Sequence, residues 1–264
     1  MEKCPHLFFG AGMEKRVGKI KSKGSLRSVV ERQGAMIIEQ DRRIMRLQRE
    51  VIISMANIIE SRDGSTGEHI KRTAIFVEML AVQLRNRWAF QEIMTKEYFD
   101  YLCMAAPMHD IGKITVPDYI LKSPTSLTVE EFEMMKNHPV AGGKIIRENL
   151  GKLESKQYIE IAADMATYHH ERWDGTGYPE GLKGNDIPLC ARIMAVADVF
   201  DALAFKRYYK EAYSLEESFK IIEESKGTHF DPIIVNALME IRPDIEKMFK
   251  EGVFDDNPQL KKVD

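Results

Sequence analysis

Two pairs of neighbouring residues have the types and spacing that metal chemistry requires. His109 directly precedes Asp110 after an apolar helical stretch, and His169 directly precedes His170 at the end of another. An imidazole and an adjacent carboxylate can bind one ion together, and a carboxylate can bridge two ions through its two oxygens. Each pair alone is weak evidence for a metal site, because a buried, hydrogen-bonded histidine is the commoner occurrence.

Three further candidate ligands stand alone in the sequence. His69 lies in the first turn of a predicted helix, His138 precedes Pro139 at a helix junction, and Asp198 lies inside a predicted helix. Each also fits a structural role, which for Asp198 is an ion pair with Arg192 or a lysine. Imidazole and carboxylate donors together suit Fe, Mn or Zn better than Mg or Ca.

The elements that must position these residues are expected to be helices. Apolar residues recur at helical spacing, and capping boxes are predicted where a Ser or Thr precedes a Glu by three residues, at Ser65, Thr128 and Ser214. Strand-like alternation is scarce, so the predicted fold class is all-α, with long loops at 111–127 and 171–188. The predicted helices cover residues 69–84, 96–109, 128–137, 139–149, 155–170, 189–205, 214–225 and 231–240.

The composition is that of a folded chain of one large domain with an appendage. The 264 residues are 44% apolar and 30% charged, which excludes a disordered chain. The longest apolar runs are shorter than the roughly 18 residues of a membrane span, so no membrane span is predicted. Three cysteines without metal-ligand or disulfide spacing favour the reducing cytoplasm as the location.

The charge is divided unequally along the chain. Residues 1–50 hold 12 Lys and Arg against 6 Asp and Glu, whereas residues 51–264 carry a net charge of −9. We expect residues 1–30 to be a flexible basic arm. Aromatic residues do not alternate with the arm's cations, so nucleic-acid binding is not predicted.

A helix is expected from about residue 29 to 59. Ile37, Ile44, Val51 and Ile58 recur every seven residues, and Leu47 occupies a matching position between them. This spacing indicates either a two-stranded coiled coil, which would make a homodimer through residues 37–58, or a helix that packs on its own domain. We therefore divide the chain into an arm and helical linker, 1–50, and a main domain, 51–264.

Taken together, the motifs resemble one family. The string from His109 to Ile114, followed by Pro117 and Asp118, resembles the HD superfamily of metal-dependent phosphohydrolases. The segment from His169 to Pro179, which contains Gly177-Tyr178-Pro179, is similar to the second signature of its HD-GYP branch. The resemblance extends from about residue 50 to 240, in the family's order.

The resemblance implies a helical domain with two divalent metal ions, Fe or Mn. One ion would be held by His69, His109, Asp110 and Asp198. Asp110 would bridge to a second ion, which His138, His169 and His170 would also hold. A third ion is not expected, because Ser65 occupies the position of the glutamate that holds it in another branch.

The resemblance also implies a substrate and a reaction. The chain is expected to hydrolyse cyclic di-GMP to pGpG, and further to GMP, through a hydroxide that bridges the metals. Asp110 and Lys113 would be catalytic, with Lys113 also contacting phosphate. Arg207 and Lys210 would bind the dinucleotide phosphates, and Tyr178 would either stack on a base or pack the Gly-Tyr-Pro loop.

Three alternatives remain open from the sequence. The site could hydrolyse another cyclic dinucleotide or a nucleotide. The chain could instead be a catalytically silent module that binds cyclic di-GMP and reports it to a partner. It could also be a scaffold that recruits a signalling domain through the Gly-Tyr-Pro loop, and this role is compatible with catalysis.

Overall fold

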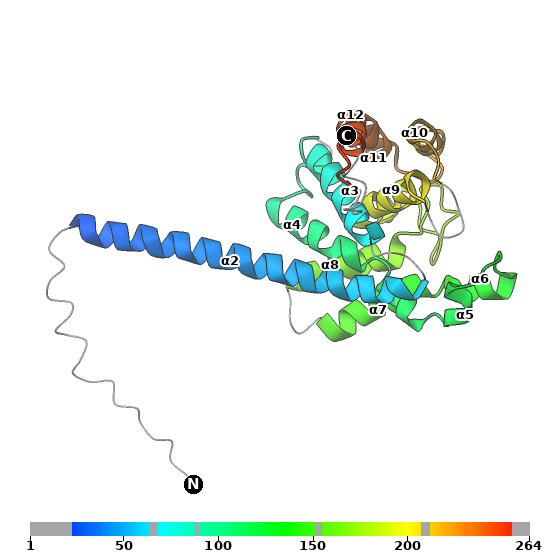
Figure 1. Ribbon diagram of the computed structural model, residues 1–264, viewed down its shortest axis with the longest axis horizontal. Coiled ribbons are helices and arrows are strands. Elements are labelled where there is room, and N and C mark those ends of the chain that lie inside the picture. Colours follow the sequence, from blue (N-terminus) through cyan, green and yellow to red (C-terminus); the bar gives the residue numbers. More distant parts are fainter. Residues whose placement is uncertain (1–22, 64–67, 88–89, 151–154, 207–211, 255–264) are drawn as a thin grey trace, which may run out of the picture. The chain divides into compact units, whose positions relative to one another are not determined.

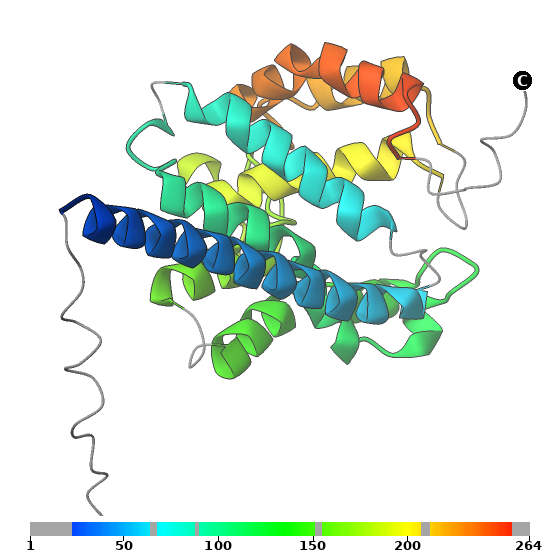
Figure 2. The same cartoon turned by 60° about the vertical axis from the view of Figure 1, so that its left-hand side comes forward.

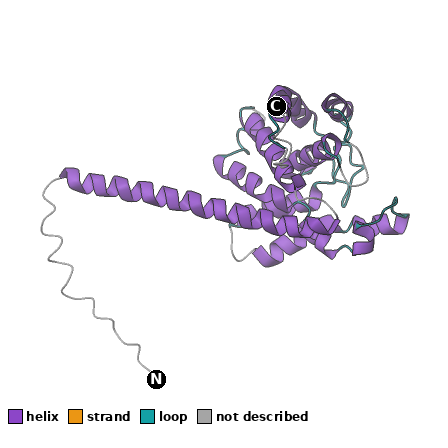
Figure 3. Ribbon diagram, viewed as in Figure 1, coloured by secondary structure: helices purple, strands orange, loops and turns teal. Residues whose placement is uncertain are grey.

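The structure of the chain is a computed structural model that describes residues 23–63, 68–87, 90–150, 155–206 and 212–254. These residues form helices joined by turns and loops, and they contain no β-strand (Figure 3). The predicted all-α class is confirmed. Among the described helices, none has the length and apolar character that a membrane span requires.

The helices follow the predicted order, with differences at their ends. Their bounds are α2 Lys23–Glu60, α3 Glu68–Arg85, α4 Lys96–Ala105, α5 Asp118–Leu121, α6 Val129–Met135, α7 His138–Leu150, α8 Lys156–Tyr168, α9 Leu189–Ala204, α10 Leu215–Glu224, α11 Pro232–Glu240 and α12 Arg242–Lys250.

Four of the expectations need correction. Helix α2 begins at Lys23, so the arm predicted over 1–30 is too long, and residues 1–22 lie outside the described residues. The helix predicted over 96–109 ends at Ala105 and continues as a 3₁₀ helix through Pro107, which has no N–H to donate. The predicted loop 111–127 contains the 3₁₀ helix Ile111–Thr115 and α5, and α12 was not predicted.

Two of the three predicted capping boxes are present. In α6 the Glu131 N–H donates to Thr128 Oγ1 at 3.2 Å, and the Thr128 N–H donates to Glu131 Oε2 at 2.8 Å. Ser214 and Glu217 make the same reciprocal pair at the start of α10. The third box, at Ser65, lies outside the described residues.

The chain divides into two compact units, Met1–Glu50 and Val51–Asp264, and α2 runs across the division. In the second unit α9 packs beside α3, α8 and α10, and α7 packs along α8 (Figures 1 and 2). Helix α9 is apolar around most of its circumference, as a helix enclosed by others must be. Its Phe200 ring packs edge-on against the Phe76 ring of α3, with ring centroids 5.1 Å apart, inside the main core.

The segment after His109-Asp110 lies in unusually close contact with the start of α7. A Cβ atom at Gly112 would lie 1.9 Å from the backbone oxygen of His138 and 2.5 Å from the backbone nitrogen of Gly142. Real Cβ contacts are never this short, so only glycine permits the approach. Gly112 thereby lets Asp110 lie next to His138.

We predict that Gly112→Ala destabilises the main unit by about 2 kcal/mol or more, because backbone atoms must move to admit the methyl group. The free energy of unfolding in urea measures this change. The matched control is Gly34→Ala in α2, where the added methyl meets nothing within 4 Å. That change should leave stability unchanged or raise it by up to about 1 kcal/mol. Equal effects of the two variants would contradict the role given to Gly112.

Candidate metal centre

Six of the seven predicted metal ligands lie together in the structure. The candidate ligand atoms of Asp110, His138, His169 and His170 all lie within 4.8 Å of one another. Those of His69, His109 and Asp110 form a second such group. Asp110 belongs to both groups, so its carboxylate is placed to join two adjacent ion sites.

Helix ends supply most of these side chains. Asp110 separates two 3₁₀ helices, His138 is the first residue of α7, and His169 and His170 directly follow α8. Adjacent residues inside an α-helix point about 100° apart, so a histidine pair converges on one centre most easily where a helix stops. This explains why neighbouring residues in the sequence can serve one site.

Backbone carbonyls fix the orientation of three of the imidazole rings. The Nδ1 atoms of His109, His138 and His169 lie 3.0, 2.7 and 3.0 Å from the carbonyl oxygens of Ala106, Met135 and Ala166. An Nδ1–H that donates to a carbonyl leaves Nε2 with its lone pair free to bind a metal. All three Nε2 atoms can therefore offer a lone pair to a metal ion at the centre.

The inward-facing atoms lack hydrogen bonds within the described part of the chain. They are Oδ1 of Asp110 and Nε2 of His109, His138 and His169, and all are buried. His138 Nε2 comes to 3.1 Å and His169 Nε2 to 3.6 Å from Asp110 Oδ1. Buried polar atoms without partners cost free energy, which a cation placed among these donors would offset. The residues thus fit divalent metal ions.

The protonation states of His109, His170 and Asp110 also suit metal binding. Burial lowers the pKa of His109 to about 4, and burial with the neighbouring His169 and His138 lowers the pKa of His170 well below its usual range. Burial by itself would raise the pKa of the Asp110 carboxyl, but Lys113 and His109 hold it well below normal. Neutral imidazoles and an ionised carboxylate are the forms that bind metal.

Asp198, the seventh predicted ligand, lies outside both groups but faces His69. Its Oδ1 is 3.4 Å from His69 Nε2. The alternative partner considered for it, Arg192, instead forms an ion pair with Asp231 at 2.6 Å. Asp198 therefore lies on the His69 side of the centre.

Sequence reasoning missed Asp201, which orients His69. Asp201 Oδ2 lies 2.6 Å from His69 Nδ1, and its other oxygen accepts a hydrogen bond from Arg72 at 2.5 Å. The signal was present, because Asp201 follows Asp198 by three residues and so shares its face of α9. A carboxylate behind a ligand histidine fixes the ring and increases its basicity.

The predicted substrate residues are only partly described. Lys113 Nζ lies 2.7 Å from Asp110 Oδ2, and the Tyr178 ring stacks on the His170 ring with centroids 4.8 Å apart. Both therefore border the centre, Lys113 beside the shared Asp110 and Tyr178 on the side of the first group, which contains His170. Arg207 and Lys210 lie outside the described residues.

A buried glutamate holds the Gly-Tyr-Pro loop in place. Glu171, 2% exposed, accepts hydrogen bonds at Oε1 from the N–H groups of Glu180 and Gly181. The N–H groups of Trp173 and Asp174 donate to the carbonyls of residues 229 and 228, which ties the same loop to the segment before α11. Tyr178 is thereby fixed against His170.

Arg62 fastens the segment that carries Lys113. Its guanidinium donates to the backbone oxygens of Lys113, Ile114 and Val116 and to the carboxylate of Asp118, at 2.6–3.2 Å. Five hydrogen bonds from one side chain fix the backbone that positions the lysine. No sequence motif considered above predicted this role.

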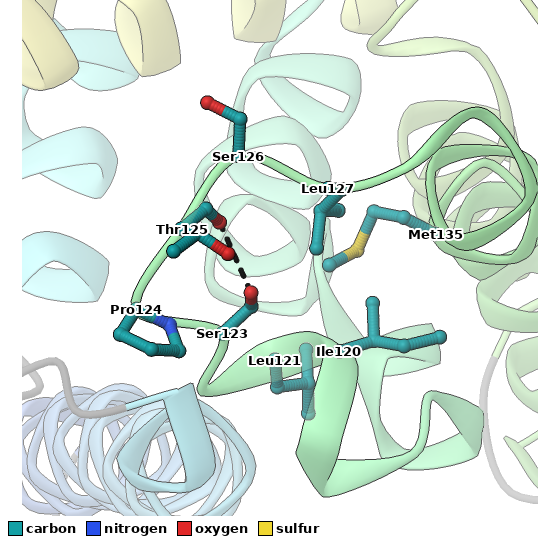
Figure 4. Close-up of a pocket in the computed structure, with 8 residues that line it drawn as sticks. All are labelled: Ile120, Leu121, Ser123, Pro124, Thr125, Ser126, Leu127 and Met135. Atoms are coloured by element: carbon teal, nitrogen blue, oxygen red, sulfur yellow. Dashed lines mark hydrogen bonds between the residues drawn. The ribbon is translucent and has the colours of Figure 1, made fainter.

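A separate pocket of about 590 Å³ lies at the loop between α5 and α6 (Figure 4). None of its lining residues is titratable, so it lacks the groups that hydrolysis requires. The lining consists of Ile120, Leu121, Ser123, Pro124, Thr125, Ser126, Leu127 and Met135.

Comparison with known proteins identifies the family of the chain. The family model of the HD domain matches residues 54–234. A probable cyclic di-GMP phosphodiesterase of Vibrio cholerae is 42% identical over 77% of this chain, and a 3'3'-cGAMP-specific phosphodiesterase of the same organism is 38% identical over 73%. The chain spans 46% and 34% of the lengths of these two relatives.

A solved structure has the same fold. The crystal structure of a cyclic GMP-AMP specific phosphodiesterase of Vibrio cholerae superposes with a TM-score of 0.56, at 19% identity, over 79% of this chain and 51% of that chain. The fold and the site together define a helical domain in which imidazole and carboxylate side chains gather in groups that could hold metal ions. The chain belongs to the HD domain family, which confirms the superfamily recognised from the motifs.

The shared position of Asp110 makes a prediction about metal stoichiometry. His69→Ala should cost mainly one ion and His138→Ala mainly the other, whereas Asp110→Ala should weaken the binding of both. Metal analysis of anaerobically purified variants measures this. His229→Ala is the control, because His229 belongs to neither group. Unchanged metal content in Asp110→Ala would contradict the assignment.

Proposed function

We propose that this chain is a metal-dependent cyclic-dinucleotide phosphodiesterase of the HD-GYP branch and that its substrate is cyclic di-GMP. The observation that carries the proposal is the pair of metal-binding groups that share Asp110 and lie beside Lys113. Two adjacent metal ions, when bound, supply a hydroxide nucleophile and neutralise the oxygens of an in-line phosphoryl displacement. The names of the relatives support the substrate.

The chain's own residues hold this chemistry in place. Asp110 and the histidines hold the ions, with Asp198 as a further ligand on the His69 side. A water molecule gives up a proton and its oxygen joins phosphorus, one P–O bond to ribose breaks, and the departing ribose oxygen gains a proton. Lys113, fixed by Arg62 through the backbone, balances the negative charge that develops on the phosphoryl oxygens.

Substrate binding would extend beyond the metal centre. Tyr178, held face to face with His170, presents the rest of its ring as a surface near the site, and burial raises its pKa, so it remains a neutral phenol. We propose that Arg207 and Lys210 bind the dinucleotide phosphates. We further propose two ions, of Fe or Mn, because imidazole-rich sites with carboxylates suit these metals.

A different cyclic dinucleotide is the second candidate substrate. The observation that favours it is the relative named for 3'3'-cGAMP, at 38% identity. The two substrates differ in one base, so the metal centre would serve either. A silent cyclic di-GMP-binding module remains the alternative from another class.

The test is turnover of both dinucleotides by protein loaded anaerobically with Fe²⁺ or Mn²⁺, with products separated by chromatography. We expect cyclic di-GMP to be opened to pGpG, and further to GMP, faster than 3'3'-cGAMP is cleaved. Lys113→Ala should lower kcat by about 10²–10³-fold, because it removes a cation from the developing charge.

The control variant is Lys122→Ala, an exposed lysine whose partner is Asp118, and its activity should match that of the unaltered protein. Binding of cyclic di-GMP without any hydrolysis in fully metallated protein would overturn the enzymatic function and favour the silent module. Faster cleavage of 3'3'-cGAMP would overturn the substrate choice alone.

We also propose that the chain forms a homodimer through α2. The side chains of Ile37, Ile44, Val51 and Ile58 recur every seven residues and are each 53–69% exposed. If these residues occupy heptad position a, their β-branched side chains favour a parallel two-stranded coiled coil. A signalling-domain partner at the Gly-Tyr-Pro loop and a cytoplasmic location also stay predictions.

The dimer predicts a specific effect of one charge. Ile44→Asp should convert a dimer to a monomer, because each chain would bury a carboxylate against its copy. Light scattering coupled to size exclusion measures the mass. Val129→Asp, at an apolar residue that is 74% exposed on α6, is the control and should leave the mass unchanged. A monomeric unaltered protein at micromolar concentration would refute the dimer.

A further inference from the structure

Helix α2 ends in a buried carboxylate beside the metal centre. Its last residue, Glu60, is only 2% exposed, and Oε1 of Glu60 lies 3.6 Å from Nε2 of His69. Both residues belong to the second unit of the chain. Glu60 belongs to none of the motifs that identify the family in this sequence.

The position of Glu60 is unfavourable for the helix itself. The carbonyl end of a helix carries partial negative charge, so a carboxylate there is destabilising. No basic residue lies in the last turn of α2 to compensate. Burial adds a second cost, because an ionised carboxylate loses its hydration. A metal cation beside Glu60 would offset both costs.

The atoms around His69 show where such a cation fits. His69 Nδ1 is bonded to Asp201, so Nε2 is the nitrogen that faces the centre. Asp198 Oδ1 lies 3.4 Å and Glu60 Oε1 3.6 Å from this Nε2. Two atoms that each lie about 2.1 Å from one tetrahedral ion are about 3.4 Å apart. The distance from each oxygen to His69 Nε2 therefore matches that between two ligands of one ion.

We infer that Glu60 is a further ligand of the ion on the His69 side. This inference rests on the proposed metal centre and adds a residue to it. The carboxylate comes from the end of α2, five residues before Ser65, whose position holds the extra glutamate in another branch of the family. The last turn of α2 is thereby joined directly to the metal centre.

A direct bond has a consequence for the helix. A metal ion that binds Glu60 must hold the final turn of α2 in its helical position, so loading the site should stabilise that turn. The backbone amides of residues 57–60 should then exchange with solvent more slowly in metal-loaded protein than in metal-free protein. If Glu60 bonded only to His69 and not to the ion, metal loading would not slow exchange at these amides.

The test uses the full chain, prepared metal-free under anaerobic conditions and titrated with Mn²⁺. Glu60→Gln should weaken one of two Mn²⁺-binding steps by about tenfold or more and leave the other unchanged. His138→Ala should weaken the opposite step. Glu68→Gln is the matched control, since Glu68 adjoins His69 in sequence but pairs with Lys71 at 3.2 Å, and its affinities should equal those of the unaltered protein.

Hydrogen exchange of the unaltered protein gives a second measurement that needs no variant to fold. Slower exchange at residues 57–60 on Mn²⁺ loading supports the inference. The inference would be overturned if Glu60→Gln bound Mn²⁺ with unaltered affinities, or if hydrogen exchange at residues 57–60 were the same with and without Mn²⁺. The proposed metal centre would still stand in that case, provided that Asp110→Ala loses metal. Absence of any Mn²⁺ binding by the unaltered protein would overturn both proposals.

Discussion

The structure depends on one carboxylate that is buried among imidazoles. Asp110 is 7% exposed, and histidines from three separate parts of the chain approach its two oxygens. The neutral imidazoles and the carboxylate all present lone pairs to the centre. The cluster therefore consists almost entirely of hydrogen-bond acceptors, with few donors to pair with them. Lys113 supplies one positive charge from the edge. Divalent cations at the centre would convert this arrangement from a cost into a source of stability.

The surrounding fold places the histidines, Lys113 and Tyr178 around the Asp110 carboxylate. Helices α7 and α8 present histidines at their ends, where neighbouring residues can face one point. Gly112 allows the Asp110 segment to reach α7 at a distance that any side chain would prevent. Arg62 and Glu171 then fasten the two loops that carry Lys113 and Tyr178. Each constraint acts on backbone, so the reacting groups stay placed without relying on contacts among themselves.

Sequence analysis predicted the helices, and it predicted most of the side chains that the structure gathers into candidate metal-binding groups, for identifiable physical reasons. Capping boxes at Thr128 and Ser214 have local signatures, and the structure reproduces both. The histidine pairs and Asp110 stand in motifs with fixed spacing. Helix ends were less predictable, as α2 and α4 show, because propensity changes little from one residue to the next there. The role of Arg62 depends on contacts with residues more than 50 positions away, which no local pattern records. Glu60 and Asp201 likewise gain their roles only when α2, α3 and α9 are brought together.

Anomalous diffraction from crystals grown with Mn²⁺ would test most directly whether Asp110 joins two ions. Two anomalous peaks about 3.5–4 Å apart, on either side of the Asp110 carboxylate, are expected for a shared two-metal centre. One peak should lie among His138, His169 and His170, and the other beside His69 and His109. A single peak away from Asp110, or no peak near these histidines, would contradict a two-metal centre built on this carboxylate.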